Sequence, residues 1–474
     1  MAKQQFIGRA RYIELLKSQE FRSGSVITAL YGRRRIGKTS LVEHVFKNAK
    51  LIKFEGIEGA PEQEQRDHFA TTLHLYSGLR EHTLLDTSSW TKLLIALSNY
   101  LKEEPAVVFF DEYQWLSAEK TSLTSYLKYV WDNFFIKDNN IHLIICGSIS
   151  SFIVKKVIKS KALYGRINTF IELKELSLPE TLNDFLKGTT DNKNLLNYYL
   201  AVGGVPKYLE LFDRAKSFEQ NIETLCFSKG GYLVNEIDRL FVSHFGANRA
   251  YKDIVKFLAS RSHATQADIQ SKIDMNSGGR LSEILEDLEY AGFINRYTPL
   301  NKPDTSNLKR YRLRDPYLRF YFNFIQPNLK NIENNNNGLA FSNVVKQSEL
   351  EIWKGLTFEN CIREHHEIVA RILGFSGVMY SSGAWYKKDD QQTGFQIDLA
   401  FIRKDKIITL CEVKYSTNIS SKVNEEMREK EQKVYKELKP DGIQKVLITV
   451  DKLDPKLNKE GVFSKFICLD DLLH

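Results

Sequence analysis

An eight-residue motif near the amino terminus constrains the fold of this chain more than any other feature. Residues 32–39 read Gly-Arg-Arg-Arg-Ile-Gly-Lys-Thr, which fits the pattern G-x-x-x-x-G-K-[ST] without a mismatch. The apolar run 26–31 before it predicts a buried strand, and the amphipathic run 40–46 after it predicts a helix. A loop between a strand and a helix aims backbone N–H groups and the positive helix end at an anion. The motif therefore predicts a phosphate-binding loop.

The residue types in this loop suit a nucleoside triphosphate bound with magnesium. Gly32 and Gly37 let the backbone turn and approach the phosphates. Lys38 is expected to reach the β- and γ-phosphates, and the Thr39 hydroxyl to bind Mg²⁺. The alternative is a chance match on a surface turn, but the flanking strand, the flanking helix and a second motif argue against it. We therefore expect ATP and Mg²⁺ as ligands.

The second motif is an apolar run, residues 106–110, closed by Asp111 and Glu112. A buried strand would carry Asp111 to the phosphate-binding loop, where it can hold Mg²⁺ through Thr39 or water. Glu112 would then polarise the attacking water as a general base. An acidic strand end facing solvent is the alternative for this motif alone, and the pairing with residues 32–39 favours the catalytic interpretation.

Two later polar residues complete the predicted nucleotide site. Ser148 ends a third core strand, where it would touch the γ-phosphate or the attacking water, or would instead cap a helix. Arg166 would stabilise the transition state, in cis or in a neighbouring subunit, or would be an ordinary surface arginine. The predicted ATP-binding residues are Gly32, Arg33, Arg34, Arg35, Ile36, Gly37, Lys38, Thr39, Ser40, Asp111 and Ser148.

Hydrophobic patterning divides the chain into three domains and a linker. In residues 1–240, strands at 26–31, 106–110, 142–146 and 169–173 alternate with helical runs, which predicts an α/β domain with a parallel sheet. In residues 245–325, helices at 251–258, 264–273 and 279–288 precede two strands at 293–297 and 309–313, the pattern of a winged helix. Residues 331–338, which are polar apart from Ile332, predict a linker or exposed loop, and we place the linker between the domains at residues 326–344. Residues 345–474 predict a third domain, with a long helix over 350–373 and a charged helix over 423–438.

A second set of chemically suited residues lies in the third domain. Asp398 stands in a strand-like run, and a turn later Glu412 and Lys414 share one face of the next strand because side chains alternate along a strand. A hairpin would bring the three together, where Asp398 and Glu412 would hold Mg²⁺ and Lys414 would orient a water for phosphodiester hydrolysis. Glu359 on the preceding helix would add a metal ligand. A charged hairpin in which Lys414 pairs with Asp398 is the alternative.

The predicted winged helix carries mixed signals for nucleic-acid binding. Its third helix bears four acids, Glu283, Glu286, Asp287 and Glu289, which would face phosphates badly in a major groove. Its hairpin is basic, with Arg296, Lys302, Lys309, Arg310, Arg312 and Arg314. We therefore expect either backbone contacts through the hairpin or a structural joint between the flanking domains.

Composition narrows the cellular setting. The net charge of +8 permits contact with nucleic acid without requiring it. The five cysteines are scattered, so no disulfide framework or structural zinc site is expected. No apolar run approaches the ~20 residues of a membrane helix, and the amino terminus lacks a signal-peptide core. These features predict a cytoplasmic protein without membrane contact.

The motifs together resemble the archaeal-type AAA ATPase family, which belongs to the extended AAA class and is close to the signal-transducing ATPases. The resemblance runs over most of residues 5–235 and is carried by Tyr31-Gly-Arg-Arg-Arg-Ile-Gly-Lys-Thr-Ser40, Asp111-Glu112, Gly147-Ser148, Leu163-Tyr-Gly-Arg166 and Gly203-Gly-Val-Pro-Lys-Tyr-Leu209. It implies a P-loop fold with a helical lid near Gly203–Leu209, with Ser148 as the sensor, and it allows a nucleotide-dependent homo-oligomer. Such proteins often carry a winged helix and a nuclease-like domain after the ATPase domain.

The third domain resembles the PD-(D/E)xK nuclease fold, which is restriction-endonuclease-like, in its D-x(13)-E-x-K spacing. The proline of the family name is absent, and Ile397 precedes Asp398 instead. The resulting hypothesis is an ATPase whose nucleotide state gates Mg²⁺-dependent cleavage of DNA, in defence or mobile-element processing. The main alternative is a nucleotide-switched signalling or scaffold ATPase that binds nucleic acid or a protein partner without cleavage. An ATPase acting on protein remains a third possibility with no sequence feature of its own.

Overall fold

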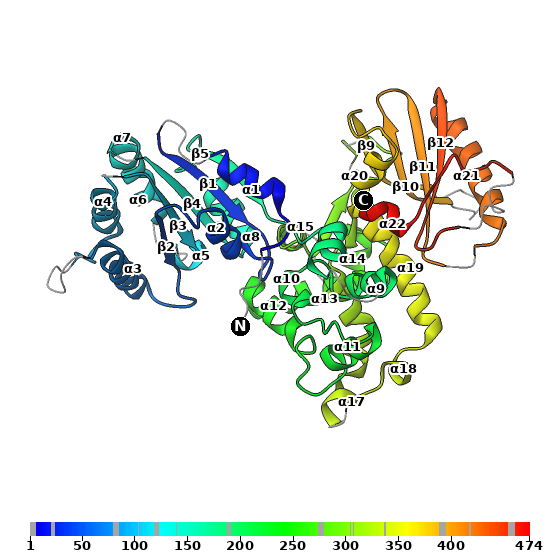
Figure 1. The fold of residues 1–474 in the computed structure, drawn as a ribbon, viewed down its shortest axis with the longest axis horizontal. Helices are drawn as coiled ribbons and strands as arrows, with labels where there is room; N and C mark the ends of the chain where they lie inside the picture. The colour runs from blue at the N-terminus through cyan, green and yellow to red at the C-terminus, as the bar shows by residue number, and fades with distance from the viewer. Residues whose placement is uncertain are drawn as a thin grey trace. The chain divides into compact units, whose positions relative to one another are not determined.

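The computed structural model forms two compact units. Unit 1 comprises the chain up to Glu175 together with Glu286–Gly292, and unit 2 comprises Leu176–Leu285 and Phe293–His474 (Figure 1). The structure describes residues 6–19, 24–78, 85–102, 104–117, 123–138, 140–186, 191–273, 279–303, 305–306, 308–335, 338–387, 395–416, 419–453 and 460–474. Within these ranges every helix is too short or too polar to span a bilayer.

Unit 1 is built on a five-stranded sheet with the order β2-β3-β4-β1-β5, in which every neighbouring pair is parallel. The strands are β1 (Val26–Tyr31), β2 (Leu51–Glu55), β3 (Ala106–Asp111), β4 (Ile141–Gly147) and β5 (Ile167–Glu172). β3 and β4 are buried along their whole length, as expected for interior strands covered on both faces. The predicted α/β fold with a parallel sheet is confirmed.

Helices cover both faces of this sheet, and alternate strand residues feed two separate cores. Val108 and Phe110 join one core with α3, α4 and α6, whereas Val107 and Phe109 join the other core with α1 and α2. The longer helices are α1 (Ala10–Lys17), α2 (Lys38–Val45), α3 (Glu62–Ser77), α4 (Trp90–Tyr100) and α6 (Leu123–Val130). The shorter ones are α5 (Tyr113–Leu116), η1 (Trp131–Phe135), α7 (Ile136–Asp138), α8 (Ser150–Phe152) and η2 (Ile153–Ile158).

Unit 2 begins with a helical segment and continues with helices and a small sheet. The helical segment contains η3 (Glu180–Phe185), α9 (Asn192–Val202), α10 (Pro206–Leu209), α11 (Phe218–Cys226) and α12 (Glu236–Phe245). It is followed by α13 (Arg249–Ala259), β6 (Ala264–Thr265), α14 (Gln266–Ile273), α15 (Gly279–Tyr290), β7 (Ile294–Tyr297) and β8 (Arg310–Leu313), and α15 belongs to unit 1 from Glu286 onward. The strands pair antiparallel in the order β6-β8-β7. The order of these elements matches the sequence-based expectation, and their assignment as a winged helix stays a prediction.

The segment predicted as a linker contains short helices and two buried side chains, Ile332 and Phe341. It follows α16 (Pro316–Phe320) and η4 (Tyr321–Ile325) and contains η5 (Gln326–Asn328), α17 (Leu329–Asn334) and α18 (Phe341–Val344). The Leu339 N–H donates to the Phe227 carbonyl at 3.0 Å, and the buried Phe341 ring contacts Phe218 and Phe227. Phe341 therefore anchors the end of the predicted linker to α11, and the domain boundaries stay a prediction. Residues 336 and 337 lie outside the described part of the chain.

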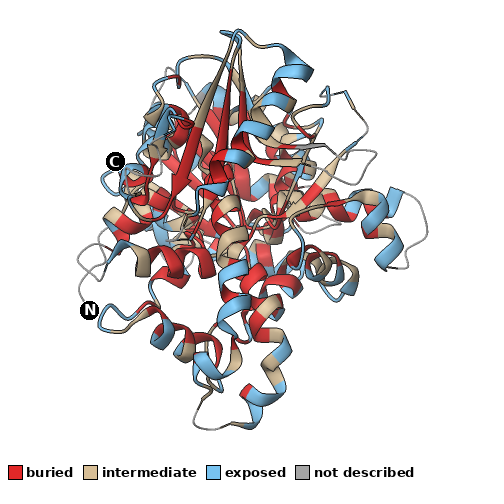
Figure 2. Ribbon diagram, turned by 90° about the vertical axis from the view of Figure 1, so that its right-hand side faces the viewer, coloured by how far each residue is buried: buried red, intermediate tan, exposed pale blue. Residues whose placement is uncertain are grey.

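The last part of unit 2 is a mixed five-stranded sheet in the order β13-β12-β11-β10-β9. Its strands are β9 (Tyr380–Lys387), β10 (Phe395–Arg403), β11 (Ile407–Lys414), β12 (Gly442–Thr449) and β13 (Lys465–Ile467). β9, β10 and β11 are antiparallel, whereas β11, β12 and β13 are parallel. β11 is buried at every position except its two ends, and Figure 2 shows buried residues running along the strands of such sheets.

The helices of this part are α19 (Gln347–Glu364), α20 (His366–Ile372), α21 (Lys422–Leu438) and α22 (Leu469–Leu473). The single helix predicted over 350–373 is interrupted at His365, whose backbone leaves the helical region at φ −106° and ψ 25°. Arg363, Glu364 and His365 therefore stand at the carboxyl end of α19.

Candidate functional site

The phosphate-binding loop connects β1 to α2, as the motif predicts. β1 ends at Tyr31 and α2 begins at Lys38. Gly37 has φ 85°, in the left-handed region that glycine adopts without strain. A Cβ on Gly32 would lie 2.4 Å from the Leu173 carbonyl oxygen, so only glycine fits between the loop and the strand end beside it. The two glycines thus fix the turn that aims the loop backbone at a ligand.

Lys38 and Thr39 of the loop have different hydrogen-bond partners. The Lys38 ammonium is buried and donates to the carbonyl oxygens of Gly32 at 2.9 Å and Arg33 at 3.0 Å. The Thr39 hydroxyl donates to the Asp111 carboxylate at 2.7 Å. Lys38 is therefore held inside the loop, and the two predicted magnesium ligands Thr39 and Asp111 lie side by side.

Glu112 is held at the end of β3 by two polar side chains. Its backbone is left-handed, with φ 47° and ψ 48°, and its carboxylate accepts hydrogen bonds from the Ser148 hydroxyl at 2.7 Å and from the Gln114 amide. Burial opposes its charge, but Lys38 and the two hydrogen bonds outweigh burial and lower the pKa of Glu112. The carboxylate is therefore ionised near neutral pH, as a general base must be.

A cavity of about 730 Å³ opens on these residues. Its lining residues are Arg34, Arg35, Gly37, Lys38, Thr39, Ser40, Glu55, Gly56, Ile57, Glu58, His68, Glu112 and Trp115. Six of these lining residues were not identified from the sequence, because β2 was not predicted. They are Glu55, Gly56, Ile57, Glu58, His68 and Trp115. The alternation of residues 51–55, Leu-Ile-Lys-Phe-Glu, is the signal that marks β2 and its carboxyl end.

The oxygen donors present suit a magnesium ion. Thr39 and Asp111 supply a hydroxyl and a carboxylate oxygen next to the loop, and Mg²⁺ in nucleotide sites takes few protein ligands together with phosphates and water. Lys53 from β2 also reaches Asp111, with its ammonium 3.4 Å from Oδ2. Across the ranges that the structure describes, no group of three His, Cys, Asp or Glu side chains is arranged to hold one metal ion.

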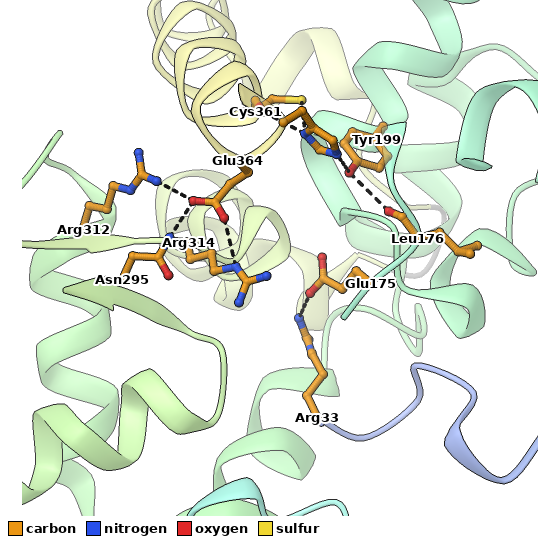
Figure 3. A network of polar contacts seen from close by, with 10 residues as sticks. Arg33, Glu175, Leu176, Tyr199, Asn295, Arg312, Arg314, Cys361 and Glu364 are labelled. Carbon is orange, nitrogen blue, oxygen red and sulfur yellow. Dashed lines mark hydrogen bonds and ion pairs between the residues drawn. The ribbon is translucent and has the colours of Figure 1, made fainter. Parts of the chain in front are cut away.

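Arg33 and Arg34 direct their side chains toward acids. The Arg33 guanidinium is buried and pairs with Glu175 at 2.7 Å (Figure 3), and Arg34 pairs with Glu58 at 2.9 Å. With their side chains paired in this way, Arg33 and Arg34 would contribute to ATP binding through their backbone N–H groups. Glu175 is the last residue of unit 1 before the chain enters unit 2. The ion pair therefore connects the phosphate-binding loop to the end of this segment of unit 1.

Arg166 lies at the wrong end of the sheet for a role in cis. It directly precedes β5, which runs parallel to β1 with Glu172 opposite Tyr31, the residue before the loop. Arg166 lies six residues before Glu172. At about 3.3 Å per strand residue, it is therefore about 20 Å from the end of the sheet that carries the phosphate-binding loop. Its guanidinium instead makes two bonds to Asp132, at 2.7 and 2.8 Å. The expectation of a cis role is corrected, and only the role in a neighbouring subunit remains as a prediction.

The second predicted site is assembled on β10 and β11. The Asp398 carboxylate accepts from the Val413 N–H at 3.0 Å, and Glu412 pairs with Lys414 at 2.9 Å. Asp398 and Glu412 are only 7% and 3% exposed, so this is no solvated surface hairpin. The hairpin alternative, with Lys414 paired to Asp398, is not what the structure has. A further residue, Lys430 of α21, also reaches Glu412, at 2.5 Å.

Lys430 was not identified from the sequence, although its spacing carries a signal. It falls three residues after Met427 and four before Val434, on the apolar face of an otherwise charged helix. A lysine at such a position must direct its ammonium to a buried partner, and Glu412 is that partner.

The carboxylates of the second site are crowded enough to disturb their titration. Burial, then the neighbouring Asp398, raise the pKa of Glu359 to about 7, although Arg363 pairs with Glu359 at 3.2 Å. Burial, then the neighbouring Glu412, raise the pKa of Asp398. Crowded buried acids favour the arrival of a cation, which would stabilise their charged forms. Asp398 and Glu412 offer the carboxylate oxygens that Mg²⁺ prefers, but Glu359 does not join them in a three-residue group arranged to hold one ion in this part of the described chain.

We expect Glu359→Gln to stabilise the protein at pH 8 but not at pH 5. Between the ordinary pKa of Glu359 and about 7, the folded state holds a proton that the unfolded chain has lost, so stability falls as pH rises through this window. The neutral amide avoids that loss, by about 2–3 kcal/mol for the shift cited. Thermal unfolding followed by circular dichroism at both pH values measures the effect. The exposed Glu367→Gln on α20 is the control, and equal stability of native and Glu359→Gln protein at pH 8 would contradict the expectation.

The end of α19 connects three parts of unit 2. Glu364 accepts hydrogen bonds from the Arg312 guanidinium and, at 2.5 Å, from the Asn295 amide, and it lies 3.3 Å from Arg314 (Figure 3). Arg312 and Arg314 are therefore paired with α19 inside unit 2, and phosphate contact through the hairpin stays a prediction. Arg310 also has an internal partner, His263.

The residues on either side of Glu364 hold other segments. The Arg363 guanidinium donates to the Asp398 carbonyl at 2.6 Å, which fixes the second site to α19. The His365 Nε2 accepts from the Leu178 N–H at 3.0 Å, which leaves the proton on Nδ1 to donate to the Cys361 carbonyl at 2.8 Å. Leu178 lies just past the start of unit 2, so His365 anchors the first residues of that unit.

Comparison with known proteins identifies the class of two segments. Residues 6–212 match a family described as an ATPase domain predominantly from Archaea, and residues 321–433 match a family described as archaeal and bacterial proteins of unknown function. An uncharacterised protein of Methanocaldococcus jannaschii is 26% identical over 413 residues, covering 86% of this chain and 87% of that protein.

A solved structure supports the fold of the ATPase part. The Walker-type ATPase PABY2304 of Pyrococcus abyssi aligns with a TM-score of 0.51 at 17% identity, covering 68% of this chain and 97% of that one. At this identity the likeness concerns the fold, and it agrees with the parallel sheet of unit 1. Residues 6–212 are therefore similar to archaeal-type ATPase domains in sequence, and residues 321–433 are similar to the second family.

Proposed function

We propose that this protein binds and hydrolyses ATP in unit 1 and that its nucleotide state gates Mg²⁺-dependent cleavage of DNA by the second site in unit 2. The observation that carries the first half is a cavity lined by Lys38, Thr39 and Glu112, in which Thr39 bonds to Asp111 and Glu112 accepts from Ser148. A lysine in a strand–loop–helix turn, a hydroxyl beside a carboxylate, and an ionised glutamate are the groups that phosphoryl transfer to water requires.

Each of these residues has a defined task in hydrolysis. The loop N–H groups and Lys38 bind the phosphates, for which Lys38 leaves the carbonyls of Gly32 and Arg33 that now hold it. Thr39 and Asp111 would hold Mg²⁺, which when bound neutralises charge on the β- and γ-phosphates. Glu112 accepts the proton of the attacking water, and Ser148 orients Glu112 or that water.

Lys38→Ala tests this part of the proposal. Loss of the ammonium removes a charge that the phosphates would meet in a buried loop, so we expect at least a 10-fold weaker ATP affinity and a loss of hydrolysis. The matched control is Lys47→Ala, an exposed lysine just beyond α2. Fluorescent-nucleotide titration and phosphate release measure the two quantities. Native affinity and turnover in Lys38→Ala would refute the assignment of the loop.

The second half of the proposal rests on the buried group of Asp398, Glu412 and Lys414. Asp398 and Glu412 would hold the ion, which when bound activates water and neutralises the phosphodiester. Lys414 would stabilise the charge of the pentavalent phosphate. Arg166, which pairs with Asp132 in this chain, would act on the ATP of a neighbouring subunit if a nucleotide-dependent homo-oligomer forms.

The experiment is DNA cleavage by purified protein with Mg²⁺ or Mn²⁺, with and without ATP. Linear, plasmid and single-stranded DNA are offered together, because the site geometry selects none of them. Cleavage that changes with ATP supports gating by the nucleotide.

A second function, a nucleotide-switched module that binds nucleic acid or a protein without cleavage, is favoured by one observation. Both oxygens of Glu412 are paired with lysines, Lys414 and Lys430, so the site is also suited to hold an anion. DNA binding without cleavage under every metal and nucleotide condition would support this alternative.

A further inference from the structure

The second site contains a lysine that no motif assigns. Lys430 lies on the side of α21 that also carries the buried Val423, Met427 and Val434, and its side chain is 14% exposed. Its ammonium meets Glu412 Oε2 at 2.5 Å, while Lys414 meets Oε1 at 2.9 Å. Both oxygens of this carboxylate therefore face ammonium groups.

Among the groups of the site that pair directly with one another, acids and cations are equal in number without a metal ion. Three acids, Glu359, Asp398 and Glu412, stand with three cations, Arg363, Lys414 and Lys430, which pair with them or bind their backbone. A divalent ion added to this set would leave an excess of positive charge among buried groups. Such an excess is costly unless a cation leaves or an anion arrives.

We propose that Lys430 is a resident cation of the second site, which competes with a divalent metal ion for Glu412 and turns to the phosphate of bound nucleic acid when the ion enters. This inference rests on the proposed metal-dependent function. Lys430 is the group to move because Lys414 follows Glu412 on the same strand, whereas Lys430 reaches it from a helix by a flexible side chain.

Two consequences distinguish this role from a structural ion pair. Removal of Lys430 frees one oxygen of Glu412, so the metal binds more tightly. A phosphodiester in the site attracts Lys430 away from Glu412, so nucleic acid and metal strengthen each other's binding by the same factor. A lysine that only holds Glu412 in place would produce neither effect, because its loss would loosen the carboxylate.

Mn²⁺ binding at pH 8, followed by electron paramagnetic resonance of the free ion without nucleotide, tests the proposal on the full-length protein. Asp398→Asn defines the fraction of bound Mn²⁺ that belongs to this site. For that fraction we expect about 10-fold tighter binding in Lys430→Met, unchanged binding in Lys430→Arg, and unchanged binding in Lys436→Met, an exposed lysine of the same helix.

A second measurement starts from the native protein. Phosphorothioate DNA, which resists cleavage, is expected to tighten Mn²⁺ binding by native protein about 10-fold, and the gain should vanish in Lys430→Met. Circular dichroism confirms that each variant is folded.

The outcomes of these measurements distinguish failure of the proposed role of Lys430 from failure of the proposed metal-dependent function. Equal or weaker Mn²⁺ binding in Lys430→Met, with Asp398-dependent binding present in native protein, overturns the role of Lys430 alone. Absence of Asp398-dependent binding in native protein and in every variant, with and without DNA, overturns the metal-dependent function and the inference together. Binding that appears only in Lys430→Met or with DNA supports both.

Discussion

Glu112→Gln is expected to reduce ATP hydrolysis by about 100-fold or more while ATP still binds. The amide keeps the size of the side chain and can still bond to Ser148, but it cannot accept the proton of the attacking water. Lys38, Thr39 and the loop backbone, which would hold the nucleotide, are untouched. Phosphate release under saturating ATP measures hydrolysis, and titration with a fluorescent nucleotide measures binding.

The matched control for this change is Glu64→Gln, which alters an exposed acid on α3. It should hydrolyse ATP at the native rate. A Glu112→Gln protein that retains hydrolysis within about threefold would show that Glu112 is not the base. In that case the carboxylate paired with Ser148 would serve only to shape the end of β3, with a correspondingly small effect.

Asp398→Asn is expected to abolish DNA cleavage while the protein stays folded and hydrolyses ATP. The asparagine oxygen can still accept from the Val413 N–H, so the strand pairing survives, but a metal ion loses a charged ligand. Gel assays with plasmid DNA and Mn²⁺ give the cleavage rate. The control is Asp405→Asn in the exposed turn between β10 and β11. Undiminished cleavage by Asp398→Asn would place the nuclease chemistry elsewhere or in a contaminant.

The same assay reveals gating. If the nucleotide state controls the second site, Lys38→Ala should remove the effect of ATP on cleavage and leave the rate without ATP unchanged. A native response to ATP in Lys38→Ala would separate the two activities.

The parallel sheet and its loop could be predicted because the local signals agree with the tertiary structure. β1, β3 and β4 are continuous apolar runs, which is how interior parallel strands appear. β2 was not predicted because it is short and mixes apolar with charged residues, as a strand at the edge of a sheet does. The cavity wall that follows β2, including Trp115 opposite it, could not be found without that strand.

The residues of the second site could be predicted from the sequence only in part. Asp398, Glu412 and Lys414 were found because period-2 alternation and a hairpin bring neighbouring strands together. Lys430 is 18 residues from Glu412, but it lies on a helix, so helix packing and not strand pairing brings the two together. The internal partners of Arg312 and Arg314 were missed for the same reason, since Glu364 reaches them from α19. Contacts between elements far apart in the chain leave no local pattern.

The position of Arg363, Glu364 and His365 determines where this protein can be cut. Trp353 of α19 packs its ring against Phe320 and Phe324, with ring centroids 5.3 and 5.6 Å away. A fragment starting at residue 345 would expose that aromatic surface and leave Glu364 and His365 without the groups they bind. Such a fragment should aggregate when expressed alone. A fragment starting at Leu176 keeps every one of these contacts, so limited proteolysis should release a resistant piece from there onward rather than an isolated carboxyl-terminal domain.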